Sequence, residues 1–599
     1  MATMTAMPNT KVPGGGFLLE ERPAADVFTP EDFSEQQRMI GQTTEEFVLN
    51  EIVPLADKME HKDYSISRDL LKKAGELGLS GVEVPEAYGG LDMDKVTAAV
   101  IADHMAKYAG FATTWGAHSG IGLLPLVYFG TEQQKKKYLP RLAAGEIVGA
   151  YALSEATSGS DAMNCRARAV LSSDGKHYIL NGEKMWITNA GFADLFTVFA
   201  KIDGEKFSAF LVERTFSGFS TGAEEHKMGI RGSSTCPVIL NDCQVPVENL
   251  LGEAGKGATI AFNILNIGRF KLGAMCLGGA RVSIESAVAY AKQRKAFGKS
   301  ISEFGLIREK IANMATLIYV GESLVYRTVG MMDMLLSEID KTSPDAGKQM
   351  RKAIEEYAVE CSILKVWGSE MIDYVVDETM QIYAGYGFVE EYPAERAYRD
   401  ARINRIFEGT NEINRLIITG FLLKRAMGGQ LPLMPAIKKL MDEVLSGPSI
   451  GEEIEGPLAE ERKVLANAKK LGLFVAGAAT QKYMAAIQDR QEVMGAIADM
   501  TIEIYAMESA VLRAQKIVEQ QGEAAAALPI AMARVYMTQA FEKVEAAAKK
   551  VIADVADGDM LRTQLAIVRR LAKHDPFNTI ALRQQIALKT IEAGKYSLA

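Results

Sequence analysis

The sequence predicts an α+β protein in which a β-rich segment interrupts a largely helical chain. Apolar residues recur at helical spacing up to about residue 148 and again from about residue 255, whereas short β-rich runs and turn signals fill the stretch between. A proline-interrupted segment, LPLMP at 431–435, then separates a further helical region. Because 599 residues are too many for one hydrophobic core, we expect several domains.

The first two parts are an extended arm, residues 1–28, and an N-terminal helical domain, residues 29–148. Glycines and prolines punctuate the arm. The segment TPED that begins at Thr29 combines a hydroxyl cap, a proline in the first turn and acids near the positive end of the helix dipole. We therefore expect the first helix to start there. One apolar stripe of this domain is formed by Leu70, Leu71, Ala74, Leu77 and Leu79.

The middle part, residues 149–254, is expected to form a small β-barrel or β-sandwich domain. Short β-rich runs occur at 167–171, 177–180, 195–201 and 207–212. Turn signals separate them: SDG at 173–175, NG at 181–182 and DG at 203–204. Short strands at this spacing are typical of such domains.

Two helical parts follow. Residues 255–430 show helical periodicity, and residues 431–599 are expected to form an extra domain of about four helices without a recognisable motif. In this last part, an apolar run at 471–478 is flanked by Arg462, Lys463, Lys469 and Lys470. The pattern suits peripheral contact with an anionic membrane or, more commonly, a bundle helix with a solvated basic face.

Composition excludes several classes of function. The 67 basic and 76 acidic residues leave a net charge of −9, which argues against a nucleic-acid-binding protein. The five cysteines include no CxxC pair and the six histidines no HExxH pair, so we expect neither a disulfide framework nor a metal site. The N-terminus lacks the features of a secretory signal or a transit peptide, and no long apolar stretch occurs. We expect a cytoplasmic protein of bacterial type.

Three segments contain residue types suited to binding or catalysis. YALSEATSGSD at 151–161 suits close backbone approach to a ligand, or a plain surface loop. KMWITN at 184–189 places Trp186 beside Thr188, which suits a flat aromatic ligand, or a core tryptophan. RIFEGTNEI at 405–413 holds Glu408 among apolar neighbours, where its pKa should rise toward that of a useful base. The alternative is that Glu408 and Thr410 only cap a helix.

Together and in this order, these segments resemble the acyl-CoA dehydrogenase family. Further matches are KMGIR at 227–231, RKAFG at 294–298 and QIYAGYGF at 381–388, and the resemblance covers roughly residues 32–427. The extra C-terminal part and NIGRF at 266–270 look most like the very-long-chain branch. The resemblance implies that residues 255–430 form a four-helix bundle and that the protein is at least a homodimer.

The resemblance also implies that FAD lies between the β domain and the bundle. The residues that match flavin contacts of the family are Tyr151, Leu153, Ser154, Ser160, Trp186, Thr188 and Thr410. The residues that match contacts to the FAD of a neighbouring subunit are Arg294, Phe297, Gln381 and Gly385. Arg294 suits a pyrophosphate because a guanidinium group can bind phosphate oxygens bidentately.

Glu408 matches the catalytic base of the family. By resemblance it takes the pro-R α-proton of an acyl-CoA thioester while the β-hydrogen leaves as hydride to FAD. The Glu408 N–H and an FAD ribityl hydroxyl would bind the thioester oxygen. The product is a trans-2-enoyl-CoA, and the electrons pass to an electron-transferring flavoprotein. Some branches place the base just before the residue matching Arg269, but here that residue is Gly268.

The acyl-CoA contacts implied by the resemblance are Ser160, Asn266, Arg269, Phe407 and Gly409. The segment WGAHSGIG at 115–122 should lie near the base of the acyl pocket. There, Gly116 and Gly120 leave room for a long tail or allow tight helix packing, and we expect His118 to be a packing residue. Two departures stand out: ATSG at 156–159 replaces a Pro-Gly pair of many members, and Asn266 replaces an acid of shorter-chain members.

Two alternatives share this fold. An acyl-CoA oxidase would use O2 as electron acceptor, and a non-enzymatic interaction or assembly protein would have lost the chemistry. The presence of Glu408, Trp186, Thr188 and Arg294 argues against lost chemistry. It does not argue against a second role.

Overall fold

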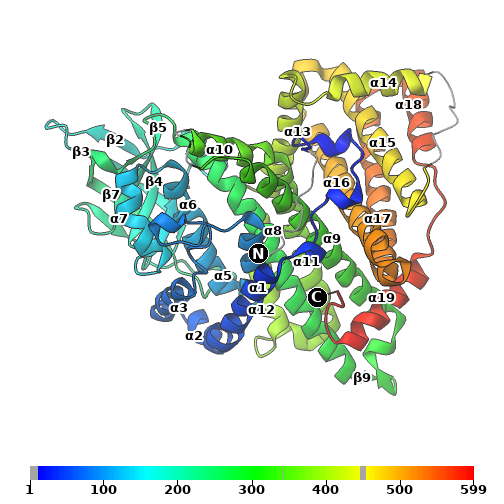
Figure 1. The fold of residues 1–599 in the computed structure, drawn as a ribbon, viewed down its shortest axis with the longest axis horizontal. Coiled ribbons are helices and arrows are strands. Elements are labelled where there is room, and N and C mark those ends of the chain that lie inside the picture. The colour runs from blue at the N-terminus through cyan, green and yellow to red at the C-terminus, as the bar shows by residue number, and fades with distance from the viewer. Residues whose placement is uncertain (1–10, 342, 344, 446–453, 599) are drawn as a thin grey trace.

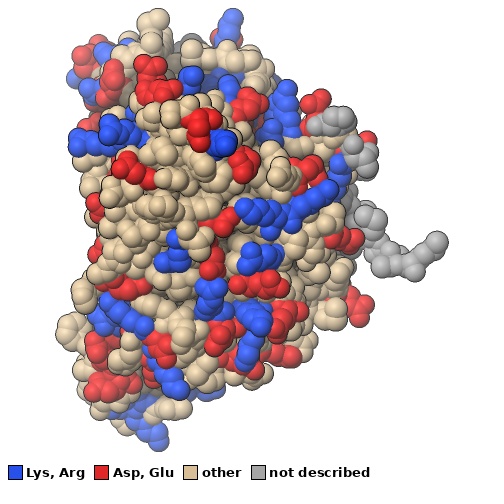
Figure 2. Space-filling view, turned by 90° about the vertical axis from the view of Figure 1, so that its left-hand side faces the viewer, with Lys and Arg blue, Asp and Glu red and all other residues tan. Residues whose placement is uncertain are grey.

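The computed structural model describes residues 11–341, 343, 345–445 and 454–598. A β domain lies at the left of Figure 1, long helices run through the centre, and the C-terminal helices stand at the right. This arrangement confirms the α+β fold class. On the face shown in Figure 2, basic and acidic side chains are interspersed and neither sign dominates.

The N-terminal arm is packed against the C-terminal helices rather than extended. Residues 1–10 lie outside the described residues, and the rest of the arm contains two short 3-10 turns, Gly16–Leu18 (η1) and Ala24–Asp26 (η2). The ring of Phe17 is buried 4.6 Å from the ring of Tyr505, and Lys469 Nζ donates to the carbonyl oxygen of Glu20 at 3.0 Å. Tertiary contacts therefore override the flexible composition of this segment.

The expected helix start at Thr29 is wrong by about one turn. Thr29 and Asp32 do form a capping box, but it closes only the 3-10 turn Pro30–Asp32 (η3). A second capping box, between Ser34 and Gln37, then starts helix α1 (Glu35–Phe47).

The N-terminal domain continues with short helices. They are α2 (Ala56–Glu60), α3 (Tyr64–Glu76), α4 (Lys95–Met105), α5 (Ala109–Gly116), α6 (Leu124–Phe129) and α7 (Glu132–Ala143). Between α5 and α6 the chain forms a π-helical segment, Ala117–Gly122 (η7). Of the expected stripe on α3, Leu70, Leu71 and Ala74 are buried, whereas Leu77 is exposed at the end of the helix.

The middle domain is one eight-stranded sheet with the order β6-β7-β3-β2-β4-β5-β8, in which β1 pairs with β4. Its strands are β1 (Gly149–Ala152), β2 (Arg168–Leu171), β3 (His177–Thr188), β4 (Leu195–Ile202), β5 (Lys206–Glu213), β6 (Phe219–Thr221), β7 (Thr235–Pro246) and β8 (Leu250–Leu251). The turn expected at Asn181-Gly182 is wrong: the pairing of β3 with β7 shifts register there, and β3 runs on through Thr188. Gly182 has a φ of 148°, and a Cβ at this position would lie 2.8 Å from Ala167 Cα, so the pair forms a bulge.

The central helices carry the site. They are α8 (Gly257–Gln293), α9 (Gly305–Ser337), α10 (Ala346–Glu356), α11 (Ala358–Tyr383), α12 (Pro393–Ala401) and α13 (Asn411–Met427), with a small hairpin of β9 (Lys295–Ala296) and β10 (Lys299–Ser300) after α8. Among the described residues, α8 alone is long and apolar enough to cross a membrane, with a window of mean hydropathy 1.2. Because 78% of that window is buried inside the protein, its composition is that of a core helix.

The C-terminal part contains six helices in the described residues rather than about four. They are α14 (Leu433–Leu445), α15 (Ala459–Tyr483), α16 (Gln491–Gln521), α17 (Glu523–Val555), α18 (Gly558–Leu571) and α19 (Thr579–Ala593). These helices share a core with the central ones: Arg327 on α9 and Glu508 on α16 form a buried ion pair at 2.6 Å. The break at 431–435 thus separates helices but not hydrophobic cores.

The membrane-facing interpretation of residues 471–478 is contradicted by their burial. Leu471, Phe474 and Val475 are fully buried on α15. Of the flanking lysines, Lys469 pairs with Glu508, and Lys470 lies 2.6 Å from Glu443. This run therefore packs inside the protein.

Candidate active site

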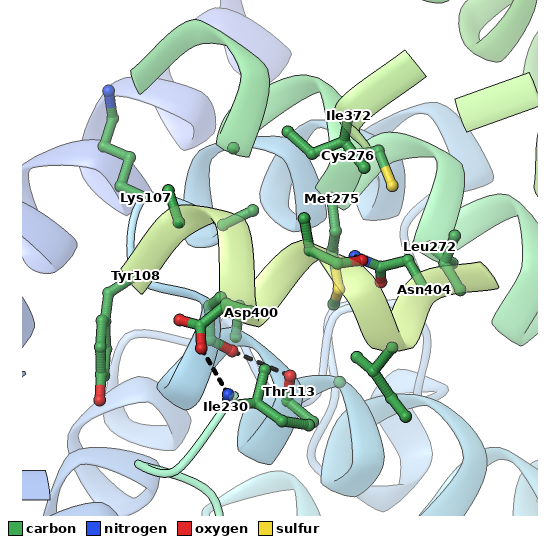
Figure 3. Close-up of a pocket in the computed structure, with 18 of the residues that line it drawn as sticks. Lys107, Tyr108, Thr113, Ile230, Leu272, Met275, Cys276, Ile372, Asp400 and Asn404 are labelled. Carbon is green, nitrogen blue, oxygen red and sulfur yellow. Dashed lines mark hydrogen bonds between the residues drawn. The ribbon is translucent and has the colours of Figure 1, made fainter. Parts of the chain in front are cut away.

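A cavity of about 480 Å³ lies between the N-terminal domain and the central helices. Figure 3 shows Leu272, Met275 and Cys276 of α8 facing it from one side and Asn404 and Asp400 from another. The residues of α8 that line it recur every three or four positions, from Gly268 to Ser283. At 1.5 Å per residue, these two positions are about 22 Å apart along the helix.

The opposite wall is formed by α5 and η7, which run antiparallel to α8. A Cβ built on Gly116 would lie 2.6 Å from Met275 Cε, and one on Gly120 would lie 3.8 Å from Lys271 Cδ. Both glycines line the cavity, so each leaves space that a side chain would occupy. The cavity is therefore a long, largely apolar tunnel with Glu408 at one end.

Glu408 supplies a carboxylate at this end of the tunnel, and its Oε2 is buried. It lies between η12 (Arg402–Arg405) and α13, with a φ of 59°, and Gly409 follows at 82°. Its Oε2 has no hydrogen-bond partner among the described residues. Burial raises the pKa of Glu408 from 4.5 to about 7, although Arg269 and Lys365 act in the opposite direction. A carboxylate with this pKa can accept a proton at neutral pH.

Gly268 makes room for this carboxylate. A Cβ on Gly268 would lie 2.7 Å from Glu408 Oε2 and 2.8 Å from its Cδ. A side chain at position 268 and the Glu408 carboxylate would thus occupy the same space. This geometry explains physically why a base can come from only one of these positions.

The backbone around Glu408 is held by two side chains. Arg269 Nε donates to the carbonyl oxygen of Glu408 at 3.3 Å, and Arg269 Nη1 donates to Asn266 Oδ1 at 3.0 Å. Asn414 Nδ2 donates to the carbonyl oxygens of Gly409 and Thr410 at 2.8 and 3.1 Å. Thr410 caps α13, since its Oγ1 accepts from the N–H of Ile413 at 3.3 Å. The capping interpretation thus holds for Thr410, whereas Glu408 faces the tunnel.

The residues of the β domain that are expected to contact the flavin lie beside the end of the tunnel that holds Glu408, or next in the chain to residues there. Thr188 lines the cavity, and the ring of Trp186 is 58% exposed with a φ of 58°. The buried hydroxyl of Tyr151 has no hydrogen-bond partner among the described residues, and burial and the nearby Glu408 raise its pKa. The Ser154 carbonyl accepts from the N–H of Met185 at 2.9 Å, which joins the loop after β1 to β3.

Of the other expected contacts, Phe407 alone belongs to the tunnel wall among those that follow. Leu153 is buried beside Ser154, Ser160 is exposed, and Phe407 lines the cavity. The loop without a Pro-Gly pair forms a tight turn, in which the N–H and C=O groups of Glu155 and Ser158 bond reciprocally at 3.0 and 3.1 Å. The loop thus closes without the usual residues.

Arg294, Phe297, Gln381 and Gly385 do not line the tunnel of their own chain. Phe297 is 95% exposed, and Gln381 and Gly385 are also exposed. The Arg294 guanidinium lies 5.6 Å from the ring centre of Tyr386, which places this group near the β9–β10 hairpin at the bottom of Figure 1. The structure therefore separates them from Glu408 within one chain.

His118 is a packing residue, as expected. Its Nδ1 accepts from the N–H of Gly149 and its Nε2 lies 3.0 Å from the carbonyl oxygen of Leu142. Burial lowers its pKa to about 4, so the ring is neutral.

Sequence patterns did not point to several residues of this region. Asp400 is buried and accepts from the N–H of Ile230 at 2.5 Å, which fixes a loop of the β domain against the tunnel (Figure 3). Lys271 lines the tunnel with its stem and forms a buried ion pair with Glu83. In the sequence, only the three-residue spacing between Gly268 and Lys271, which puts both on one face of a helix, could have indicated that Lys271 belongs to the site.

Comparison with known proteins agrees with this geometry. Family descriptions of the acyl-CoA dehydrogenase N-terminal, middle and C-terminal domains match residues 34–146, 150–243 and 255–423, and a second C-terminal domain description matches 467–570. The chain is 49% identical to a probable acyl-CoA dehydrogenase of Bacillus subtilis over 98% of both chains.

This chain belongs to the acyl-CoA dehydrogenase family. A crystal structure of an acyl-CoA dehydrogenase from Bacillus anthracis in complex with FAD is 51% identical, with a TM-score of 0.95 over 98% of this chain and 100% of that one. The very long-chain specific enzyme of rat mitochondria is 37% identical over 75% of this chain and 70% of its own length. Butyryl-CoA dehydrogenase of Megasphaera elsdenii is 35% identical, with a TM-score of 0.59 over 65% of this chain and 98% of that one. The resemblance seen in the sequence is confirmed, and the chain is an acyl-CoA dehydrogenase.

Proposed function

We propose that this acyl-CoA dehydrogenase oxidises long-chain acyl-CoA thioesters to trans-2-enoyl-CoA with FAD as cofactor. The observation that carries the proposal is the Glu408 carboxylate at the end of a long apolar tunnel, whose buried Oε2 has no hydrogen-bond partner in the part of the chain that the structure describes. A base in this position can remove a proton from the carbon next to a thioester whose tail lies in the tunnel.

Glu408 performs the proton half of the reaction. Its carboxylate takes the pro-R α-proton, and the electron pair of that C–H bond becomes the α,β double bond as the β-hydrogen leaves with its own pair. Bound FAD would supply the hydride acceptor for that hydrogen. The Glu408 N–H donates to the thioester oxygen and stabilises the negative charge that develops there. Arg269 donates to the carbonyl oxygen of the same residue and so helps to hold the backbone of this turn.

The length of the tunnel supports a long acyl chain. An extended chain advances about 1.25 Å per carbon, so a tunnel wall of about 22 Å holds about sixteen to eighteen carbons. Each buried methylene contributes about 0.8 kcal/mol. Gly116 and Gly120 keep the first half of this path open.

The residues beside Glu408 fit a flavin. The exposed flat ring of Trp186 adjoins Thr188, and the Tyr151 hydroxyl, which has no hydrogen-bond partner among the residues described, provides a buried polar group at the same end of the tunnel. We propose that these residues, with Leu153, Ser154 and Thr410, hold the isoalloxazine part.

The separated group of Arg294, Phe297, Gln381 and Gly385 suits a second subunit. Its members are exposed and lie away from the tunnel, so we propose that they bind the FAD of the neighbouring copy in a homodimer. Arg294 would pair with the pyrophosphate. We propose an electron-transferring flavoprotein as the acceptor of the electrons.

The test is an anaerobic titration of the flavin-loaded protein with saturated acyl-CoAs from four to twenty carbons. We expect bleaching near 450 nm that is strongest at about sixteen carbons, and none on the same timescale with Glu408→Gln. A yellow protein that no acyl-CoA reduces would refute the proposal and favour an interaction protein. Rapid reoxidation of the reduced flavin by O2 would instead indicate an acyl-CoA oxidase.

A further inference from the structure

Lys365 is a fully buried cation near the active site that the mechanism above does not use. It lies on α11, and its Nζ donates to Asn411 Oδ1 at 2.6 Å. Asn411 is the first residue of α13, and its Nδ2 donates to Ser369 Oγ at 3.0 Å and Glu370 Oε1 at 3.1 Å. The ammonium group is therefore anchored to the helix turn that directly follows Glu408.

The burial of Lys365 calls for a compensating interaction. Transfer of an ammonium group to the protein interior costs several kcal/mol unless an opposite charge or hydrogen bonds compensate it. Among the described residues, no carboxylate forms an ion pair with Lys365, and Asn411 supplies a neutral acceptor. Glu408 is the strongest of the groups that favour its charged form. Burial lowers the pKa of Lys365 to about 8, which still leaves it mostly charged at neutral pH.

The titratable groups around Glu408 come from three elements. Arg269 on α8 and Lys365 on α11 favour its ionised form, and Tyr151 on β1 faces it as a neutral phenol. Lys365 itself also faces Arg269, Cys276 and Glu412.

Arg269 has a second task that Lys365 lacks. Its guanidinium is hydrogen-bonded to the Glu408 carbonyl and to Asn266. Removal of Arg269 would thus disturb the backbone of the turn directly, whereas Lys365 touches neither the carboxylate nor the turn backbone. Lys365 is therefore the cation whose charge can be tested separately.

We propose that Lys365 is a positioning residue of the reaction, which anchors the start of α13 and supplies a positive charge that favours the ionised form of Glu408. This inference rests on the proposed function, in which ionised Glu408 removes the α-proton. A purely structural lysine would hold Asn411 but would not influence how the rate depends on pH.

The experiment is single-turnover reduction of the flavin by hexadecanoyl-CoA, measured anaerobically between pH 5.5 and 9.5. In Lys365→Met we expect the midpoint of the pH–rate profile to move upward by about one pH unit or more. The rate at pH 7 should fall about ten-fold and recover near pH 9. Flavin content and melting temperature are measured on the same samples.

Two further variants separate charge from structure. Lys365→Arg keeps the charge, so its midpoint should stay at the wild-type value whatever its plateau rate. Lys516→Met deletes another buried lysine, which lies on α16 and donates to the Val27 carbonyl oxygen at 2.8 Å. This variant should leave the midpoint of the pH–rate profile unchanged.

The outcomes are distinct. Equal loss of rate at every pH in Lys365→Met would overturn the inference and leave the proposed function intact. If Lys365→Met does not fold, Lys365→Gln takes its place, because it removes the charge and can still hydrogen-bond to Asn411. An upward shift of its midpoint would support the inference, and an unmoved midpoint would overturn it. A wild-type protein that acyl-CoA cannot reduce would overturn the proposed function, and this inference with it.

Discussion

On the proposed long-chain specificity, Gly116→Leu should shift the preferred substrate to medium-chain acyl-CoA thioesters. A Cβ at this position would lie 2.6 Å from Met275 Cε, the mobile end of a flexible side chain on the facing wall. We expect Met275 to turn aside and the leucine to block the tunnel at its level. Because Gly116 has helical dihedral angles, the leucine adds little backbone strain.

The magnitude follows from the position of the block. Met275 lies about 10 Å along α8 from Gly268, which leaves room for about eight carbons of an extended chain. A sixteen-carbon chain would lose contacts for about eight methylenes, with a ceiling of about 6 kcal/mol at about 0.8 kcal/mol each. If the tail recovers half of this by bending, kcat/KM for hexadecanoyl-CoA falls by about 100-fold.

The assay is kcat/KM for acyl-CoAs of four to twenty carbons, with an artificial electron acceptor. Octanoyl-CoA should stay within a few-fold of the wild-type value. Gly495→Leu serves as the control, because a Cβ on that helical glycine of α16 meets no atom within 4 Å. Equal loss for octanoyl-CoA and hexadecanoyl-CoA, or no loss for either, would refute the tunnel assignment.

Three further predictions concern the base and the cofactor. Glu408→Gln should stabilise the fold by up to about 3 kcal/mol at pH 8.5, because burial raises the pKa of Glu408 from 4.5 to about 7 and its ionised form is disfavoured in the folded state. This gain should disappear as the pH falls from 7 to 4.5, and urea denaturation that shows the same gain at pH 5 and 8.5 would contradict the reasoning. Gly268→Ala should slow flavin reduction at least about ten-fold with flavin still bound, because its Cβ would lie 2.7 Å from Glu408 Oε2; a rate near wild type would argue against this packing. Arg294→Ala should release flavin on extensive dialysis, which absorbance measures, and unchanged flavin content would count against its pyrophosphate role.

The errors in the sequence-based fold have local causes. Asn181-Gly182 has the composition of a hairpin turn, but β7 pairs along both halves of β3 and turns the pair into a bulge. The sequence of the apolar run at 471–478 is compatible with a membrane-facing helix and with a core helix. Only the packing of α15 distinguishes the two. Composition likewise could not show that the arm is buried against Tyr505.

The sequence by itself determined the order of helices and strands and the family, and it pointed to Glu408 as the proposed base. Helical spacing and short β-rich runs are local patterns, and Glu408 stands in a motif specific enough to be read without coordinates. Only the tertiary structure decided which residues support that base. Gly268, Lys365 and Tyr151 lie far from Glu408 in the chain. Gly268 and Tyr151 stand in segments that the sequence singled out, but neither their contact with the carboxylate nor the place of Lys365 beside it could be seen there. Their influence depends on distance and burial, which arise only when α8, α11 and β1 pack around one carboxylate.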